Sequence, residues 1–295
     1  MTRLMSKLLI VTLLSSSGVG LFAKNIKKDV NLTAEQKHQK RLLSYVKKAI
    51  SVNKDFSLKG ISIRQSKKVK DLPGWKIYFL DIDLKLLKQK GKTMTVHDKI
   101  FSNGKYITRD FVNIVNRASL KDKIVPDMDS SFYRKDHLLY GNENAPAKIV
   151  VFSDPICPFC QEYLPKLLKA AKENPDKIAL YYYHFPLTML HKEAPTIIKA
   201  AMVLEEKGGK NIMEKIYAKK FNIDTDDDKK ILAEFNKKMN SNVTLEDIKD
   251  KKIVSRYEED LKMAGKMMIS GTPTVYVNGK KDFSRNKYRE IIGKK

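Results

Sequence analysis

The segment Lys148-Ile-Val-Val-Phe-Ser-Asp-Pro-Ile-Cys-Pro-Phe-Cys160 joins an apolar run to two cysteines that are three positions apart. The apolar run predicts a buried strand, and the residues after the second cysteine predict a helix over Gln161–Lys172. A Cys-x-x-Cys that follows a buried strand and opens a helix places its first thiol where the helix dipole and free backbone N–H groups favour the thiolate. We therefore expect Cys157 to be the exposed nucleophile and Cys160 to be the more buried thiol that resolves a mixed disulfide.

The two residues between the cysteines fit the same interpretation. Pro158 suits the first turn of a helix, where its missing N–H is not needed. Phe159 brings no formal charge beside Cys157, so stabilisation of the thiolate has to come mainly from the helix end. Two other interpretations remain open on the residues alone: a static disulfide, and half of a zinc site completed by His184 or His191. His184 lies in a predicted strand and His191 at the start of a helical region, which favours structural roles for both.

The first residues have the pattern of a secretory signal peptide. Arg3 and Lys7 supply positive charge, and an uncharged, largely apolar stretch follows as far as Ala23. The apolar stretch is shorter than the ~20 residues that a membrane-spanning helix needs, which argues against a retained anchor. We expect residues 1–23 to be removed and the chain to reach the periplasm, an oxidising compartment in which a cysteine pair can turn over as a disulfide.

Composition excludes several classes of protein. The 295 residues are 42% apolar and 31% charged, as in a soluble globular protein, and two cysteines are too few for a multi-disulfide scaffold. Lys and Arg number 58 and Asp and Glu 34, a net charge of +24. The lysines are scattered and no nucleic-acid-binding motif accompanies them, so we expect a basic solvated surface and no nucleic-acid partner.

Residues 24–120 predict a small α+β domain. Thr33 can cap a helix that runs to Ile50. An Asn103-Gly104 turn separates the last two predicted strands. Strands are predicted at 58–63, 75–84, 93–101 and 106–115. His97 lies within one of them and is expected to be structural. Residues 121–136 are polar and are predicted to be a linker.

Residues 137–295 predict a second domain of alternating strands and helices. A second strand is expected at Ile178–Phe185 and a last one within Gly271–Gly279, with a short helix from about Ser284. Between these strands, residues 188–270 read as a helical insertion. Helices are predicted at 196–207, 211–219, 228–239 and 245–267. The acidic run Asp224–Asp228 lacks the glycine of a calcium loop and is better interpreted as capping the next helix.

Two motifs resemble one known family. The stretch Gly141–Cys160 resembles the Dsb proteins, exported thiol–disulfide oxidoreductases of the thioredoxin superfamily. The stretch Gly271-Thr272-Pro273-Thr274 is similar to the family's cis-proline loop. The resemblance implies an α/β thioredoxin fold with a helical insertion and a redox-active Cys157–Cys160 disulfide, and it implies no cofactor. It also implies a cis Pro273 beside Cys157, with the backbone of Thr272 pairing with an extended substrate segment.

Different parts of the chain resemble two different branches of the family. Tyr183-His-Phe-Pro-Leu187 and the helical insertion are similar to the DsbA-like oxidases. Val151, where that branch often has an acidic residue, is similar to the DsbC and DsbG isomerases, and so is the N-terminal α+β region. The second resemblance implies a dimerisation domain over 24–120 and a homodimer. The absent acid leaves no residue assigned to deprotonate Cys160.

We therefore expect an isomerase or reductase in preference to an oxidase. The expected partners are unfolded or misfolded exported proteins with cysteines and a membrane redox partner. A non-enzymatic alternative is a periplasmic chaperone-like binding protein whose disulfide is structural.

Overall fold

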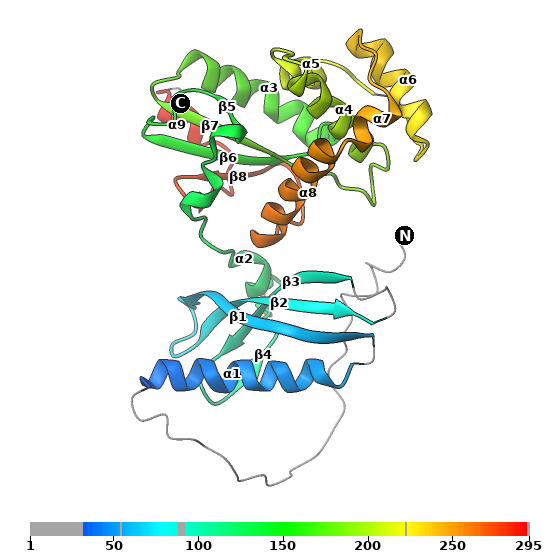
Figure 1. The fold of residues 1–295 in the computed structure, drawn as a ribbon. Coiled ribbons are helices and arrows are strands. Elements are labelled where there is room, and N and C mark those ends of the chain that lie inside the picture. Colours follow the sequence, from blue (N-terminus) through cyan, green and yellow to red (C-terminus); the bar gives the residue numbers. More distant parts are fainter. Residues whose placement is uncertain (1–31, 54, 88–91, 222, 294–295) are drawn as a thin grey trace. The chain divides into compact units, whose positions relative to one another are not determined.

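The computed structural model describes residues 32–53, 55–87, 92–221 and 223–293 (Figure 1). The chain divides into two compact units, Met1–Lys121 and Asp122–Lys295. The predicted signal peptide, residues 1–23, lies outside the described residues. Among the described residues, no helix is both long and apolar enough to cross a bilayer.

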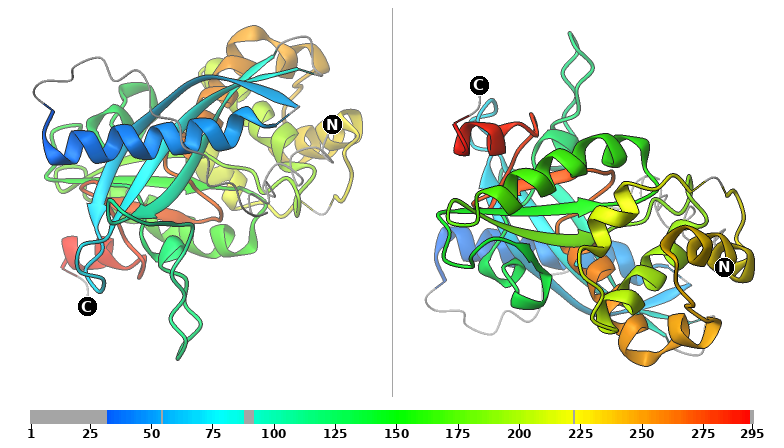
Figure 2. Two further views of the ribbon diagram at one scale, coloured as in Figure 1. Left: turned by 90° about the horizontal axis from the view of Figure 1, so that it is seen from below. Right: turned by 90° about the horizontal axis from the view of Figure 1, so that it is seen from above.

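The N-terminal unit begins with helix α1 (Ala34–Ser51), as the sequence predicts. Thr33 caps it: the Thr33 hydroxyl accepts from the backbone N–H of Gln36, and the Gln36 side chain accepts from the backbone N–H of Thr33. Helix α1 lies along one face of the sheet (Figure 2). Its apolar stripe faces that sheet, with Leu42 buried and Leu43, Val46 and Ile50 packed beside it.

Four antiparallel strands form the sheet of this unit. They are β1 (Phe56–Lys68), β2 (Lys76–Leu86), β3 (Thr93–Ser102) and β4 (Ile107–Thr108), in that order. The buried side chains of β2, among them Tyr78 and Leu80, supply most of the core under α1. His97 lies in β3 with its Nδ1 2.7 Å from Oδ1 of Asp81, in agreement with its predicted structural role.

The last predicted strand of this unit, 106–115, is wrong beyond its first residues. Only Ile107 and Thr108 pair with β3, because local side chains then satisfy the backbone. The Asp110 carboxylate accepts from the N–H groups of Phe111 and Lys121 and folds the chain back on itself. The result is an arm over residues 111–119, closed by a bridge between Val112 and Ser119.

Residues 121–136, predicted as a linker, contain several short helical turns. These are α2 (Leu120–Lys123) and the 3-10 turns η1 (Ser130–Phe132) and η2 (Lys135–His137). Phe132 is fully buried in a core cluster of the second unit, and the N–H of Met128 donates to the carbonyl of Gly279. The later part of this segment is therefore packed against the second unit.

The second unit is built on a five-stranded mixed sheet in the order β5-β7-β6-β8-β9. Strands β6 and β7 are parallel, and β8 runs antiparallel to β6. The strands are β5 (Leu138–Tyr140), β6 (Ala147–Ser153), β7 (Ile178–His184), β8 (Thr274–Val277) and β9 (Lys280–Lys281). The crossover between β6 and β7 is α3 (Pro158–Glu173), which places the cysteines at the carboxyl end of a central strand.

Helices cover both faces of this sheet (Figures 1 and 2), and alternating residues of β6 face two separate cores. Ile149 and Val151 point toward one face, while Val150 and Phe152 point toward the other. The first face is covered by α3 and by most of the helical insertion, the second by α8 and the 3-10 turns. The remaining helices are α4 (Ala194–Glu206), α5 (Ile212–Tyr217), α6 (Asp228–Met239), α7 (Leu245–Lys249), α8 (Lys251–Lys266) and α9 (Lys287–Ile291).

Two helix boundaries bear on the sequence predictions. Asp227 caps α6 by accepting from the N–H groups of Lys229 and Lys230, which confirms the capping interpretation of the acidic run. The predicted helix 245–267 is divided in two, because Asp250 ends α7 in a non-helical conformation and its side chain caps α8.

Candidate active site at the first turn of helix α3

The turn that leads into α3 is held by its own polar groups. The Asp154 carboxylate accepts from the N–H of Ile156 at 2.8 Å, and the N–H of Cys157 donates to the carbonyl of Asp154 at 3.2 Å. Cys157 is the N-cap residue of α3, and Pro158 follows at the first helical position. Cys157 thus lies where the unpaired N–H groups of the first turn converge.

The two sulfurs have opposite acidities. Cys157 receives hydrogen bonds from the Cys160 thiol, which is the largest effect, and from the backbone N–H groups of Cys160 and Phe159; with the nearby Thr272 hydroxyl they lower the pKa of Cys157 to about 5. Cys160 is fully buried, and burial raises its pKa well above the ordinary value for a thiol. At neutral pH the reduced site therefore holds a Cys157 thiolate beside a protonated Cys160.

The cis-proline loop lies against the first cysteine. The Thr272–Pro273 peptide bond is cis, as the resemblance implies, and Cys157 Sγ is 3.7 Å from the carbonyl oxygen of Thr272. Because this loop packs over it, Cys157 is only 3% exposed, so the prediction of an exposed Cys157 is wrong. Pro273 is buried, whereas Phe159 is 69% exposed and projects from the helix start. The structure thus brings Cys157, Cys160 and Thr272 together, although they are up to 115 positions apart in the chain.

The histidines considered as zinc ligands lie in other environments. His184 is buried in β7, as predicted for a packed strand residue. His191 precedes α4, and its Nδ1 is 2.8 Å from Oδ2 of Asp154. Within residues 32–293, apart from the three short gaps, no group of three or more His, Cys, Asp or Glu side chains could hold a metal ion.

Two sets of residues near the cysteines escaped the sequence analysis. The first is the Asp154–His191 pair, which ties the loop before α4 to the active-site turn. The second is a buried row of hydroxyls on Ser153, Tyr217 and Tyr182. Ser153 and Asp154 follow directly after a predicted strand, and that position could have marked them as residues of the site. Tyr217 is 64 positions from Ser153, and nothing local in the sequence connects the two.

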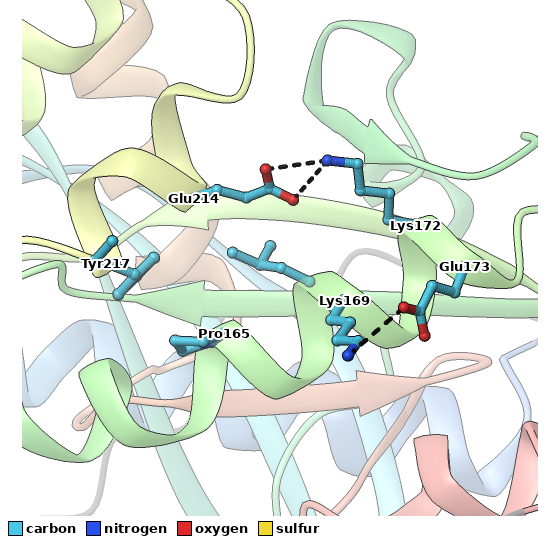
Figure 3. Close-up of a pocket in the computed structure, with 8 residues that line it drawn as sticks. Pro165, Lys169, Lys172, Glu173, Glu214 and Tyr217 are labelled. Carbon is cyan, nitrogen blue, oxygen red and sulfur yellow. Dashed lines mark hydrogen bonds and ion pairs between the residues drawn. The ribbon is translucent and has the colours of Figure 1, made fainter.

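A surface pocket of about 500 Å³ lies between α3 and α5 (Figure 3). The Nζ of Lys172 donates to the Glu214 carboxylate at 3.1 Å across it, and the Tyr217 side chain forms part of its wall. Neither cysteine nor the cis-proline loop lines this pocket.

Comparisons with known proteins agree with this geometry. The family model described as Thioredoxin matches residues 134–292. A Bacillus cereus protein named "Probable disulfide bond formation protein D" is 28% identical over 149 residues, which cover 47% of this chain and 68% of the relative.

Two solved structures are also similar to this chain. Oxidised BdbD from Bacillus subtilis is 22% identical with a TM-score of 0.42, covering 54% of this chain and 91% of the other. Pseudomonas aeruginosa DsbA2 is 24% identical with a TM-score of 0.37, covering 50% and 84%.

The family model spans more than half of the chain and contains both cysteines and the cis-proline loop. The chain therefore belongs to the thioredoxin family.

Proposed function

We propose that this protein donates disulfides to exported proteins that contain reduced cysteines, with Cys157 as the sulfur that reacts with the partner and Cys160 as the resolving sulfur. The observation that carries the proposal is the placement of Cys157 at the N-cap of α3 and of the fully buried Cys160 one turn later, which gives the two thiols opposite acidities. A stabilised Cys157 thiolate lowers the free energy of the reduced form, and a disulfide whose reduced form is stabilised is a strong oxidant. The low pKa of Cys157 therefore favours an oxidase over the isomerase or reductase that the sequence led us to expect.

The reaction consists of two balanced exchanges. A substrate thiol loses its proton to solvent, and the thiolate attacks Cys157 Sγ of the oxidised site. The Cys157–Cys160 bond breaks, its electron pair remains on Cys160, and that sulfur takes up a proton. A second substrate thiolate then attacks the substrate sulfur of the mixed disulfide, which forms the substrate disulfide and releases Cys157 as a thiolate.

Thr272 and Pro273 are proposed to align the substrate. The Thr272 carbonyl is 3.7 Å from Cys157 Sγ, so a substrate segment that pairs with this backbone would bring its cysteine to the reacting sulfur. The exposed Phe159 ring at the start of α3 offers an apolar contact to an unfolded segment. No cofactor is required, because electrons pass between dithiols and disulfides. Reoxidation of the site is assigned to a membrane redox partner in the periplasm.

A trapping experiment tests the proposed roles. Cys160→Ser whose Cys157 is first converted to the mixed disulfide with nitrothiobenzoate should react with an unfolded substrate protein that has a single reduced cysteine. The substrate thiolate attacks Cys157 Sγ, nitrothiobenzoate leaves, and the Cys157–substrate mixed disulfide should accumulate because no Cys160 thiol is present to break it. Cys157→Ser should form none and should lose all oxidation of the substrate. If Cys157→Ser bound the unfolded substrate as well as the unmodified protein, and the unmodified protein did not oxidise it, the chaperone-like alternative with a structural disulfide would replace this proposal.

Disulfide isomerisation is the second candidate function. The N-terminal unit supports it, because a separate helix-on-sheet unit, if it dimerised, would let two catalytic units face one substrate. The apolar Val151, at the position where the DsbA-like oxidases often have an acidic residue, also supports it. Recovery of a scrambled multi-disulfide substrate by the reduced protein, dependent on residues 24–120, would favour the isomerase. Rapid oxidation of a reduced substrate without such recovery would favour the oxidase.

A further inference from the structure

Three buried hydroxyl groups form a connected row behind Cys160. Ser153 Oγ is 2.7 Å from the Tyr217 hydroxyl, and the Tyr217 hydroxyl is 2.7 Å from that of Tyr182. Ser153 is fully buried, Tyr182 and Tyr217 are 6% exposed, and the Ser153 hydroxyl lies near enough to Cys160 to lower the pKa of that thiol. The row thus starts at the resolving sulfur and continues into the core of the helical insertion.

The sheet register explains why the row lies under the cysteines. Val151 and Ser153 are two residues apart on β6, so they share the face that α3 covers. Val151 is paired with Tyr182 on the neighbouring strand β7, so Tyr182 lies beside the position at which the sequence lacks a buried acid. Tyr217, at the end of α5, has its hydroxyl between those of Ser153 and Tyr182 and within hydrogen-bond distance of both.

We propose that the Ser153 hydroxyl, oriented by Tyr217 and Tyr182, stabilises the Cys160 thiolate that forms during each exchange, in the role that Val151 leaves vacant. This inference rests on the proposed function, because it assigns a group to the resolving step of that reaction. Ser153 is a catalytic residue in this account, since it touches a reacting sulfur. Tyr217 and Tyr182 are positioning residues, since they act through Ser153.

The physical reason is the cost of a charged sulfur in a dry site. Cys160 is fully buried, so its thiolate has little access to water, and a hydrogen bond to a charged group is worth more than one between neutral groups. A row of hydroxyls can rotate its protons so that Ser153 donates to the sulfur, Tyr217 donates to Ser153, and Tyr182 donates to Tyr217. No proton has to leave the row, and the proton lost by Cys160 goes to solvent.

Other titratable groups near Cys160 are already engaged. Cys157 hydrogen-bonds Cys160 within the same helical turn, and this contact raises the pKa of Cys160. Asp154 reaches Cys160 through its backbone; its carboxylate accepts from the N–H groups of Ile156 and Leu187 and pairs with His191. The hydroxyls of Ser153 and Thr272 both lower the pKa of this thiol, and the Ser153 hydroxyl is the one connected to the row.

The test follows the two steps of oxidation by 5,5′-dithiobis(2-nitrobenzoate) in a stopped-flow instrument. In the first phase Cys157 attacks the reagent, forms a mixed disulfide and releases one nitrothiobenzoate. In the second phase the Cys160 sulfur loses its proton and attacks Cys157 Sγ, which releases a second nitrothiobenzoate and forms the Cys157–Cys160 disulfide. At saturating reagent the second phase is first order and reports the resolving step alone.

We expect Ser153→Ala and Tyr217→Phe to slow the second phase about tenfold relative to the first, and Tyr182→Phe to slow it less. The variants should need a higher pH than the unmodified protein to reach the same second-phase rate, because loss of the Ser153 hydroxyl raises the pKa of Cys160. Tyr217→Phe keeps the ring that forms part of the pocket wall in Figure 3, so packing there is retained. A first phase with the rate and pH dependence of the unmodified protein shows that the Cys157 site of each variant is folded.

Tyr163→Phe is the matched control. Tyr163 lies on α3 itself, and its hydroxyl is buried without a hydrogen-bond partner, so its removal should leave both phases unchanged. Second phases of unaltered rate and pH profile in Ser153→Ala and Tyr217→Phe would overturn the inference while leaving the proposed function intact. Absence of the first phase in the unmodified protein would overturn the proposed function instead.

Discussion

Cys157 and Cys160 are separated by one helical turn, yet they differ in their hydrogen-bond donors and in how deeply they lie. Cys157 is met by two backbone N–H groups of the first turn and by the thiol of Cys160. Cys160 is enclosed by the sheet and the helical insertion, and burial dominates its acidity. The proposed roles of Cys157 as the reacting sulfur and Cys160 as the resolving sulfur thus follow from their positions at the N-cap and within the first turn of α3.

The acidity of Cys157 gives a pH dependence with a definite sign. Its pKa in the folded chain is about 5, against 9.0 for an ordinary cysteine thiol, so the folded protein releases this proton at lower pH than the unfolded chain. The thiolate's contribution to the stability of the reduced form is fully present above pH about 9 and is lost as the pH falls through about 5. The free energy of unfolding of the reduced protein, relative to that of Cys157→Ser, should therefore increase as the pH rises from about 5 to about 9.

Alkylation kinetics measure the same quantity directly. The rate of reaction of Cys157 with iodoacetamide should rise with pH along a single titration with a midpoint near 5. Cys160→Ala removes the thiol that donates to Cys157 and puts no other donor in its place, so it should raise that midpoint toward the ordinary range. A midpoint between about 8 and 9 in the unmodified protein, the range of a free thiol, would contradict the electrostatic account of the site.

At the scale of elements, the strand–turn–helix around the cysteines could be predicted because its determinants are local. The apolar run of β6, Pro158 at the helix start and the capping side chains of Thr33 and Asp227 all act within a few residues. The predicted strand 106–115 was wrong because the side chain of Asp110 forms a backbone turn that competes with strand pairing. The hydroxyl row could not be predicted, since it depends on the register of β6 with β7 and on a helix far along the chain.

The edge strand β5 depends on a single glycine. Gly141 has a φ of +88°, and a Cβ at this position would overlap the carbonyl oxygen of Ile178. Gly141→Ala should therefore lower the free energy of unfolding by more than about 2 kcal/mol, because the left-handed backbone alone costs about 1–2 kcal/mol and the overlap adds to it. Urea denaturation of the protein measures the change.

Gly208→Ala is the comparison for that substitution. Gly208 has a φ of +82°, but no atom lies within 4 Å of the place that the methyl group would take, so only the backbone cost of about 1 kcal/mol should appear. Equal losses for the two substitutions would show that β7 moves aside and that the close approach at Gly141 is not a constraint.

At the scale of the whole molecule, the arm over residues 111–119 is the feature that bears on assembly. Ile114 and Val115 are 94% and 90% exposed, and the arm leaves the sheet of its own unit (Figure 2). Large apolar side chains gathered on a projecting segment are typical of a protein–protein contact. We propose that a second copy of the chain covers them, which is the homodimer expected from the sequence.

A double substitution tests this assembly. Ile114→Asp with Val115→Asp should convert the dimer to a monomer in sedimentation equilibrium, because two charges would be buried at the contact. Mixed-disulfide formation by Cys157 should persist, since the reacting thiol lies in the other unit. Tyr45→Lys, at an exposed apolar position on α1, should leave the dimer intact. A double variant that remained dimeric would show that another surface forms the contact.

The two units also differ in how far the sequence alone determined their function. The second unit has two cysteines and a cis-proline loop, and these residue types restrict the chemistry to thiol–disulfide exchange. The N-terminal unit has no comparable cluster among its described residues, so its role depends on which of its surfaces binds another molecule. The sequence around Ile114 reads as a strand, and nothing in its pattern indicates that these side chains are exposed on an arm.

The most direct test of the account is the reduction potential of the Cys157–Cys160 disulfide, measured by equilibration with a glutathione buffer. Because the reduced form is stabilised by the Cys157 thiolate, the potential should lie above about −200 mV, which is more oxidising than the roughly −270 mV of thioredoxin. A value below about −300 mV, in the range of structural disulfides, would contradict the disulfide-donor function and would identify the pair as a structural crosslink.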